Sequence, residues 1–74
     1  MLEINGIYWE IKLVSPNHPA VRRLNGEYAL AACDDITKCI YLRSDIPSYK
    51  IKKVLCHEIT HAAMFSYGVI ITAE

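Results

Sequence analysis

Alternating apolar and polar positions open the chain and predict a β-hairpin. Two apolar runs, residues 2–4 and 7–14, flank Asn5-Gly6, the dipeptide that best tolerates the positive φ angles of a two-residue hairpin turn. In the second run apolar residues recur at every other position from Ile7 to Leu13, which is the period of a half-buried strand. Trp9 lies at the centre of this apolar face, so we expect it in the core.

Two further strands are predicted after a loop. Pro16 and Pro19 cannot donate ladder hydrogen bonds, so the second strand ends before them. Residues 27–33 and 38–43 are rich in Tyr, Ile and Leu and are joined through the turn at 34–37. These patterns predict an antiparallel sheet over the first 43 residues.

The apolar period then changes to three and four residues, which predicts a helix. Pro47, preceded by Asp45 and followed by Ser48, is typical of a helix start, and Gly68 of a helix stop, so the helix should span about 47–67. One stripe of apolar residues should pack on the sheet; its members are Ile51, Leu55, Ile59 and Ala62. The predicted fold class is α+β: a short antiparallel β-sheet packed against one long helix, in a single domain of 74 residues with a tail at 69–74.

Composition and charge narrow the functional classes. Eight Lys+Arg balance eight Asp+Glu, so no excess charge attracts nucleic acid or a membrane surface. The longest apolar run, residues 28–33, is too short to span a bilayer, and residues 1–5 lack the pattern of a secretory signal. We therefore expect a cytoplasmic protein with no nucleic-acid partner and no membrane contact.

The three cysteines agree with the expected cytoplasmic location. Their number is odd and their spacing is not that of a zinc ribbon or a disulfide framework. Cys33 and Cys39 flank a short turn and could face each other across a hairpin, as a bridge or a shared metal site. Packing as reduced thiols is the favoured interpretation.

The predicted helix carries His57-Glu58-Ile59-Thr60-His61, the pattern His-Glu-x-x-His. Positions four apart lie one turn above each other, so both imidazoles can reach one metal ion from one face. At about 100° per residue, His61 lies near 40° from His57, Glu58 near 100°, and the apolar stripe near 160°. The three side chains should therefore lie at the rim of the core face, where a crevice can open.

Zinc suits two imidazoles and an oxygen ligand, and it keeps a fourth position for water. Bound Zn²⁺ lowers the pKa of that water towards 7, and Glu58 beside it can take the proton as the water attacks a polarised carbonyl. The simpler alternative is a chance grouping of two histidines and a glutamate on a solvated helix face. The position in mid-helix after a sheet favours the metal site.

Apolar residues on the histidine side of the helix raise a second expectation. Val54, Met64 and Phe65 share this side, where a fully solvated face would be polar. We expect a second helix, a partner chain or self-association to cover Met64 and Phe65. Lys50, Lys52 and Lys53, at the start of the helix, are interpreted as a solvated face.

The segment Lys53–Ala62 resembles the active-site helix of the zincins, and more narrowly that of the small ImmA/IrrE-like metallopeptidase-type proteins of prophages and mobile elements. The strand at 38–42 and the turn at 25–27 are similar in order and spacing to the strands before that helix. The resemblance implies that His57 and His61 bind zinc and that Glu58 is the catalytic base. It also implies a third, acidic ligand on the next helix.

Glu74 is the one acidic residue in that direction, thirteen positions after His61. Members of the family continue past such a point with an acidic cluster and a full helix, so we expect a truncated version or a site with fewer protein ligands. Asp34 and Asp35 are other oxygen donors, although paired aspartates in a turn are more often a solvated hairpin device. His18, in a proline-flanked loop, is expected to be exposed.

Three functional hypotheses follow. The first is a zinc-dependent metallopeptidase that hydrolyses an extended peptide added to the sheet edge, with a repressor-like protein as the substrate that the resemblance implies. The second is a non-catalytic module that keeps the fold and serves in protein interaction. The third is an inert fragment of a longer gene.

Overall fold

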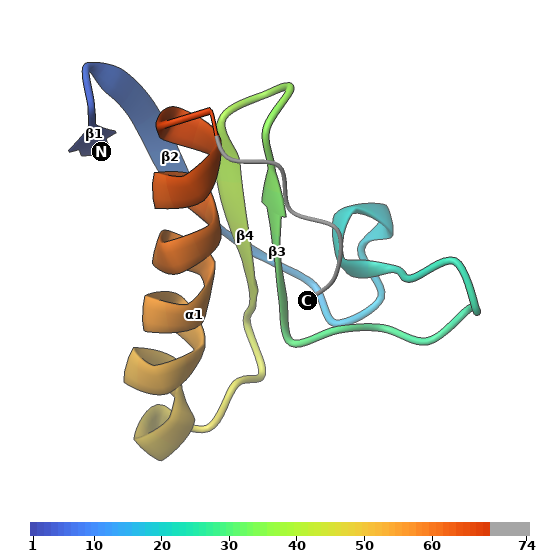
Figure 1. Cartoon of the computed structure of the whole chain (residues 1–74). Helices are drawn as coiled ribbons and strands as arrows, with labels where there is room; N and C mark the ends of the chain where they lie inside the picture. Colours follow the sequence, from blue (N-terminus) through green and yellow to red (C-terminus); the bar gives the residue numbers. More distant parts are fainter. Residues whose placement is uncertain (69–74) are drawn as a thin grey trace.

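The computed structural model describes residues 1–68, in which one helix lies across one face of a four-stranded sheet (Figure 1). This arrangement confirms the α+β class. The elements follow in the order β1 (Leu2–Ile4), β2 (Ile7–Val14), the 3₁₀ turn η1 (Pro19–Val21), β3 (Ala31–Asp34), β4 (Cys39–Arg43) and α1 (Ser48–Ser66).

The predicted hairpin at the start of the chain is confirmed. β1 and β2 pair antiparallel, with Leu2 opposite Trp9. Asn5 and Gly6 have φ angles of 52° and 80°, the left-handed region that both central residues of a type I′ turn occupy. The turn chemistry therefore sets the register that directs Trp9 towards the core.

The sheet is mixed, so the prediction of an antiparallel sheet is wrong for one pair. The strand order is β1-β2-β4-β3, and β2 pairs parallel with β4 from Glu10 opposite Cys39 to Val14 opposite Arg43. Turn residues predict pairing between strands that are neighbours in sequence, and β2 and β4 are not. The crossover places β4 in the sheet interior and makes β3 an outer strand.

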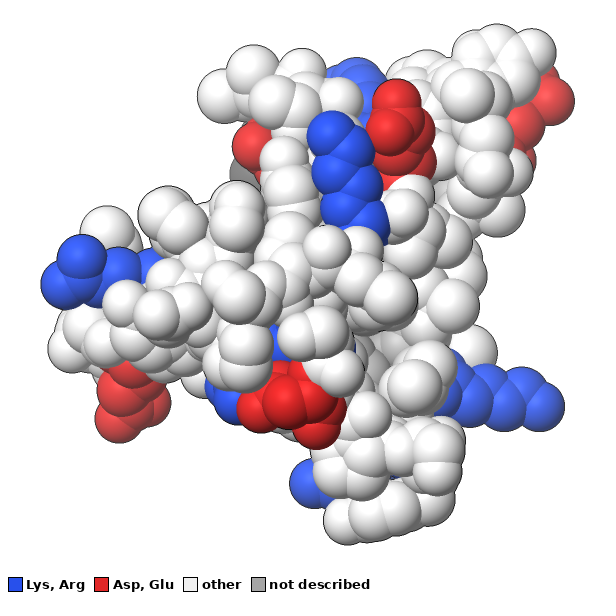
Figure 2. Space-filling view, turned by 180° about the vertical axis from the view of Figure 1, so that it is seen from behind, with Lys and Arg blue, Asp and Glu red and all other residues white. Residues whose placement is uncertain are grey.

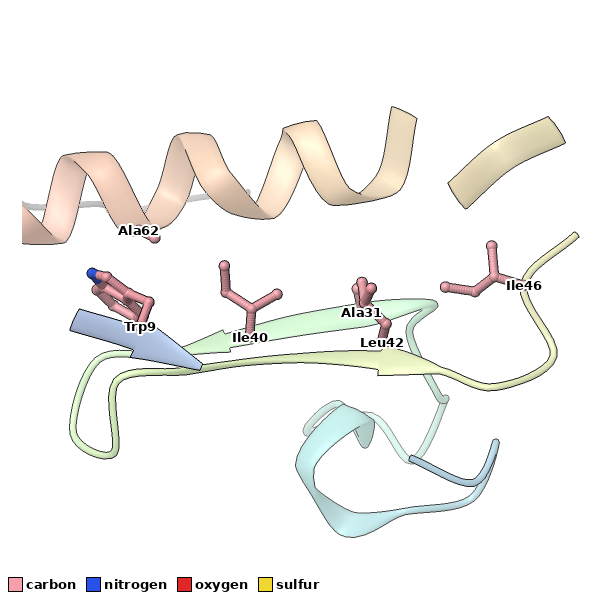
Figure 3. Close-up of a cluster of buried hydrophobic side chains, with 6 residues drawn as sticks. All are labelled: Trp9, Ala31, Ile40, Leu42, Ile46 and Ala62. Atoms are coloured by element: carbon pink, nitrogen blue, oxygen red, sulfur yellow. The ribbon is translucent and has the colours of Figure 1, made fainter. Parts of the chain in front are cut away.

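The core lies between α1 and the sheet (Figure 3). Trp9 and Ile40 are fully buried, which confirms the expectation for Trp9. Ile11 and Leu13 share the face of Trp9, yet they are 42% and 72% exposed, so the half-buried pattern of β2 holds only in its first half. The buried cluster consists of Trp9, Ala31, Ile40, Leu42, Ile46 and Ala62.

The predicted helix forms with nearly the expected bounds, and its last turn is tied to the hairpin. Gly68 has a φ of 76°, and its N–H donates to the Phe65 carbonyl, as expected of a glycine that ends a helix. Trp9 Nε1 donates to Ser66 Oγ at 2.8 Å, and Asn5 Nδ2 donates to the Ser66 carbonyl at 3.0 Å. The end of α1 is thus held by side chains of β2 and of the β1–β2 turn.

The face that α1 turns to the sheet includes most of the predicted stripe, because Ala62 lies in the core and Leu55 and Ile59 pack against it, but the face is rotated. Ile51 is 42% exposed, whereas Glu58 and His61 are buried. The middle of the buried side of α1 therefore lies nearer to Glu58 than the predicted stripe does. Glu58 and His61 are buried and do not lie at the rim of the core face, where they were predicted. Pattern reasoning places charged and polar residues outside by default, whereas these two side chains are buried facing each other.

The cysteine placement is also settled. All three cysteines are free thiols. Cys33 lies opposite Ile40, and Asp34 lies opposite Cys39. Since side chains alternate along a strand, Cys33 and Cys39 point to opposite faces of the sheet and do not face each other. Cys39 is buried and Cys33 half-buried, in agreement with packing as reduced thiols, whereas Cys56 is exposed and the expectation of packing is wrong for it.

Candidate metal centre

One side of α1 brings two imidazoles and a carboxylate together. His57, Glu58 and His61 offer ligand atoms that all lie within 4.8 Å of one another. Glu58 Oε1 lies 3.5 Å from His61 Nδ1, and Glu58 Oε2 lies 3.9 Å from His57 Nε2. The two imidazole rings are 4.5 Å apart between centroids and inclined by 67°. The two histidines, four residues apart on the helix, therefore lie close together, as their spacing predicts.

The three side chains differ in their access to solvent. The Glu58 side chain is 5% exposed and that of His61 10%, whereas that of His57 is 57% exposed. The Glu58 side chain is thus buried on the sheet side of α1, whereas the His57 side chain is exposed to solvent. An incoming molecule reaches the cluster from the side of His57.

This group of side chains could hold a metal ion. Imidazole nitrogens and carboxylate oxygens bind zinc at about 2.0–2.2 Å, which places two donors of a tetrahedral ion about 3.5 Å apart. The distance of 3.5 Å between Glu58 Oε1 and His61 Nδ1 equals this spacing, whereas the ligand atoms of the whole group lie within 4.8 Å of one another. His57 and His61 are the residues that could hold the ion, with Glu58 beside it.

The other oxygen and nitrogen donors considered from the sequence are not part of the cluster. Asp34 Oδ1 accepts hydrogen bonds from the Ile36 and Thr37 N–H groups, and the bond from Ile36 is the main cause that lowers the pKa of Asp34. Asp35 pairs with Lys38 within the same turn. Both aspartates therefore stabilise the β3–β4 turn, as expected of paired aspartates in a hairpin.

His18 and Glu74 have different outcomes. His18 Nδ1 accepts from the Ala20 N–H at 3.0 Å, and its ring stacks on Tyr41, so His18 caps η1 and is half-buried rather than exposed. Glu74 lies outside the described residues, and its role as a metal ligand stays a prediction.

One cysteine, which the sequence related only to Cys39, is affected by the charge of a cluster residue. Cys33 in β3 is half-buried on the helix face of the sheet. Burial, followed by the negative charge of Glu58, raises the pKa of the Cys33 thiol to about 12. The two residues are thus electrostatically coupled across the helix–sheet interface. No local sequence pattern relates the two residues, because their proximity depends on where β3 lies in the sheet.

A cavity adjoins the exposed histidine. Its volume is about 320 Å³, and it lies between the first half of α1 and the beginning of β3. Three cationic side chains line it together with His57 and four apolar residues; the full set is Arg23, Ala29, Leu30, Ala31, Lys50, Lys53, Val54 and His57. The spacing of Lys50, Lys53 and His57, three and then four residues, places them on one helix side and could have indicated this cavity.

The apolar residues expected to be covered by a partner divide between core and surface. Phe65 packs against the core, with its ring 6.5 Å from that of Trp9. The chain itself therefore covers part of this side chain. Met64 remains 39% exposed. Cover by a second helix or partner chain stays a prediction.

On the face of the molecule behind that of Figure 1, charge is dispersed. Seen from behind, charges of both signs are scattered among uncharged side chains (Figure 2). Within residues 1–68, no helix is both long enough and apolar enough to cross a membrane.

Comparisons of the chain with protein-family models, with curated proteins and with solved structures give no match.

Proposed function

We propose that this protein is a zinc-dependent peptidase that uses the cluster on α1. The observation that carries the proposal is the convergence of His57, Glu58 and His61 within 4.8 Å on one helix side. The resemblance to ImmA/IrrE-like zincins agrees with it. His57 and His61 would hold the ion, which when bound supplies a Lewis acid for a peptide carbonyl and a lowered pKa for water.

Glu58 is positioned to act as the general base. Its carboxylate is buried and lies within 3.9 Å of both imidazoles, which fixes its position relative to a substrate held beside them. The carboxylate takes a proton from the attacking water as the water oxygen bonds to the carbonyl carbon. It then gives that proton to the leaving amine as the C–N bond breaks.

The outer strand suits an extended peptide. Among the described residues β3 pairs only with β4, so its other edge can accept main-chain hydrogen bonds from a substrate. β3 also packs against α1, and its Cys33 side chain is coupled to Glu58. A peptide paired with this edge would pass the side of the helix that carries His57.

The first test is the zinc content of the purified protein. Close to one zinc per chain is expected, with loss in His57→Ala and retention in His18→Ala, because His18 is a histidine outside the cluster. Absence of zinc from protein prepared with an excess of the metal would exclude the peptidase.

The second test measures cleavage of an unstructured peptide library by mass spectrometry. Glu58→Gln should lower the cleavage rate by about 10²–10⁴-fold, the usual contribution of a general base, while zinc content is unchanged. Glu3→Gln, at an exposed carboxylate in β1, is the matched control. Stoichiometric zinc without any cleavage by the wild type would favour the interaction module instead.

A further inference from the structure

The second half of β2 carries an apolar pattern that the core does not use. Ile11 and Leu13 follow Trp9 on the same face of the strand, yet they are 42% and 72% exposed, whereas Trp9 is fully buried. Exposed apolar side chains that gather on one surface mark interaction sites. The pattern is therefore unexplained by the fold of one chain.

The same residues lie along an open edge of the sheet. Within residues 1–68, β1 pairs only with residues 7–9 of β2, and residues 10–14 pair only with β4 on the other side. An open edge with apolar side chains is a template for pairing with another strand.

The backbone groups of Ile11 and Leu13 point towards this open edge. The Glu10 N–H donates at 3.0 Å to the carbonyl that precedes β4, and the Val14 carbonyl accepts at 2.8 Å from the N–H that follows β4. Because successive residues of a strand direct their backbone groups to opposite edges, those of residues 11 and 13 point away from β4. The segment thus presents two N–H groups and two carbonyls to an incoming strand.

A second copy of the segment is complementary to the first. When two such strands run antiparallel about residue 12, Ile11 of one lies opposite Leu13 of the other, and each pair can exchange two backbone hydrogen bonds. Side chains that lie opposite each other are about 4.5–5.5 Å apart at Cβ, so Ile11 covers the exposed Leu13 of the other copy. A two-fold axis at residue 12 relates the copies, as in an isologous dimer.

Charges on the other face of the strand fit the same register. Glu10 and Lys12 are both exposed, with Glu10 Oε2 4.0 Å from Lys12 Nζ. In the paired strands Lys12 lies opposite Lys12 of the second copy and diagonal to its Glu10. The two carboxylates thus flank the two ammonium groups and offset their repulsion. The segment supplies the apolar and charged complement of its own edge, which favours a second copy over an unrelated peptide.

We propose that the protein forms a symmetric dimer in which residues 10–14 of β2 pair antiparallel, about residue 12, with the same residues of a second copy. The pairing joins two four-stranded sheets into one continuous sheet with both α1 helices on the same face. β3 lies at the other edge of each sheet, so the edge assigned to the substrate stays open. The dimer does not depend on the proposed peptidase function.

Sedimentation velocity of the full chain measures the dimer. The contact of one short strand is a weak interface, so the wild type should pass from monomer to dimer between about 10 µM and about 1 mM. Leu13→Lys should weaken the dimer by at least about tenfold. Leu24→Lys is the matched control, because Leu24 is a fully exposed leucine outside β2. Circular dichroism checks that each variant is folded.

Two charge variants test the register. Lys12→Thr and Glu10→Thr each change a net charge of zero by one, so they alter the overall repulsion between copies equally. Lys12→Thr removes a pair of like charges and should tighten the dimer by up to about fivefold, whereas Glu10→Thr should weaken it. Effects of the same sign would overturn the pairing about residue 12.

Amide hydrogen exchange identifies the paired edge without any variant. The Ile11 and Leu13 amides should be protected only at concentrations where the dimer forms, whereas the Lys12 amide, which faces β4, should be protected throughout. A chain that stays monomeric, a dimer that survives Leu13→Lys, or an equal loss in Leu24→Lys overturns the proposal. So does protection of the Ile11 and Leu13 amides in a monomer by an added unstructured peptide, because the edge would then serve a peptide partner.

Discussion

At the scale of single residues, the buried carboxylate of Glu58 is the most informative group. The imidazoles of His61 and His57 lie 3.5 Å and 3.9 Å from its two oxygens. The same charge acts on Cys33 across the interface, where it adds to burial in raising the pKa of the thiol. The local field beneath α1 therefore disfavours any further negative charge.

The Cys33 thiol should consequently resist alkylation. The thiolate is the reactive form, and a thiol whose pKa is raised to about 12 stays protonated at pH 8. With iodoacetamide at pH 8, peptide mapping by mass spectrometry should show modification of the exposed Cys56 well before Cys33. The difference should shrink as the pH rises towards 12. In guanidinium all three cysteines should react at similar rates, and equal rates in the native protein would contradict the raised pKa of Cys33.

The grouping of His57, Glu58 and His61 was predictable from the sequence, whereas its surroundings were not. The four-residue spacing of His57 and His61 follows from helix geometry alone. The proximity of Cys33 and Arg23 to the cluster depends on where β3 lies in the sheet, and no local pattern encodes that position. The degree of burial of Glu58 likewise depends on the rotation of α1 over the sheet.

At the scale of elements, the C-terminal end of α1 is attached to the β1–β2 hairpin. Ser66 receives a hydrogen bond from Trp9 at its hydroxyl and one from Asn5 at its carbonyl. His61 lies five residues before Ser66, so the same attachments orient the helix turn that carries the candidate ligand. The sequence predicted the hairpin turn and the helix stop separately, but not the contact between them, because that contact joins residues 61 positions apart.

Removing the buried hydrogen bond should destabilise the protein. Ser66→Ala leaves Trp9 Nε1 buried without its acceptor, which should lower the free energy of unfolding by about 1–3 kcal/mol. Urea denaturation followed by circular dichroism measures the change. Ser48→Ala, at an exposed position of the same helix, should change stability by less than about 0.5 kcal/mol. Equal effects of the two variants would show that the Trp9–Ser66 bond contributes nothing.

At the scale of the whole molecule, the parallel pairing of β2 with β4 determines which strands form the edges of the sheet. With strands in sequence order β4 would be the outer strand, whereas the observed order puts β3 there. β3 packs against α1, and its first residue, Ala31, lines the cavity beside His57. The hairpins were predictable because their turns are local; the crossover was not, because Glu10 and Cys39 are distant in sequence.

Zinc should stabilise the whole fold. A chain of 74 residues is expected to be marginally stable, and a ligand at 100 times its dissociation constant adds about 2.7 kcal/mol if it binds only the folded state. The thermal unfolding midpoint should therefore rise with zinc and fall again with a chelator. His61→Ala should abolish the shift and His18→Ala should retain it. A shift that persists in His61→Ala would place the metal elsewhere.

The Trp9–Ser66 hydrogen bond has a spectroscopic consequence. Trp9 is the sole tryptophan of the chain, it is fully buried, and its indole N–H contacts the last turn of the helix that carries both histidines. Its emission therefore reports whether α1 is docked on the sheet, while the far-ultraviolet signal reports whether α1 is helical. The native chain thus carries its own fluorophore for distinguishing release of the helix from its unfolding, with no label added near the candidate metal centre.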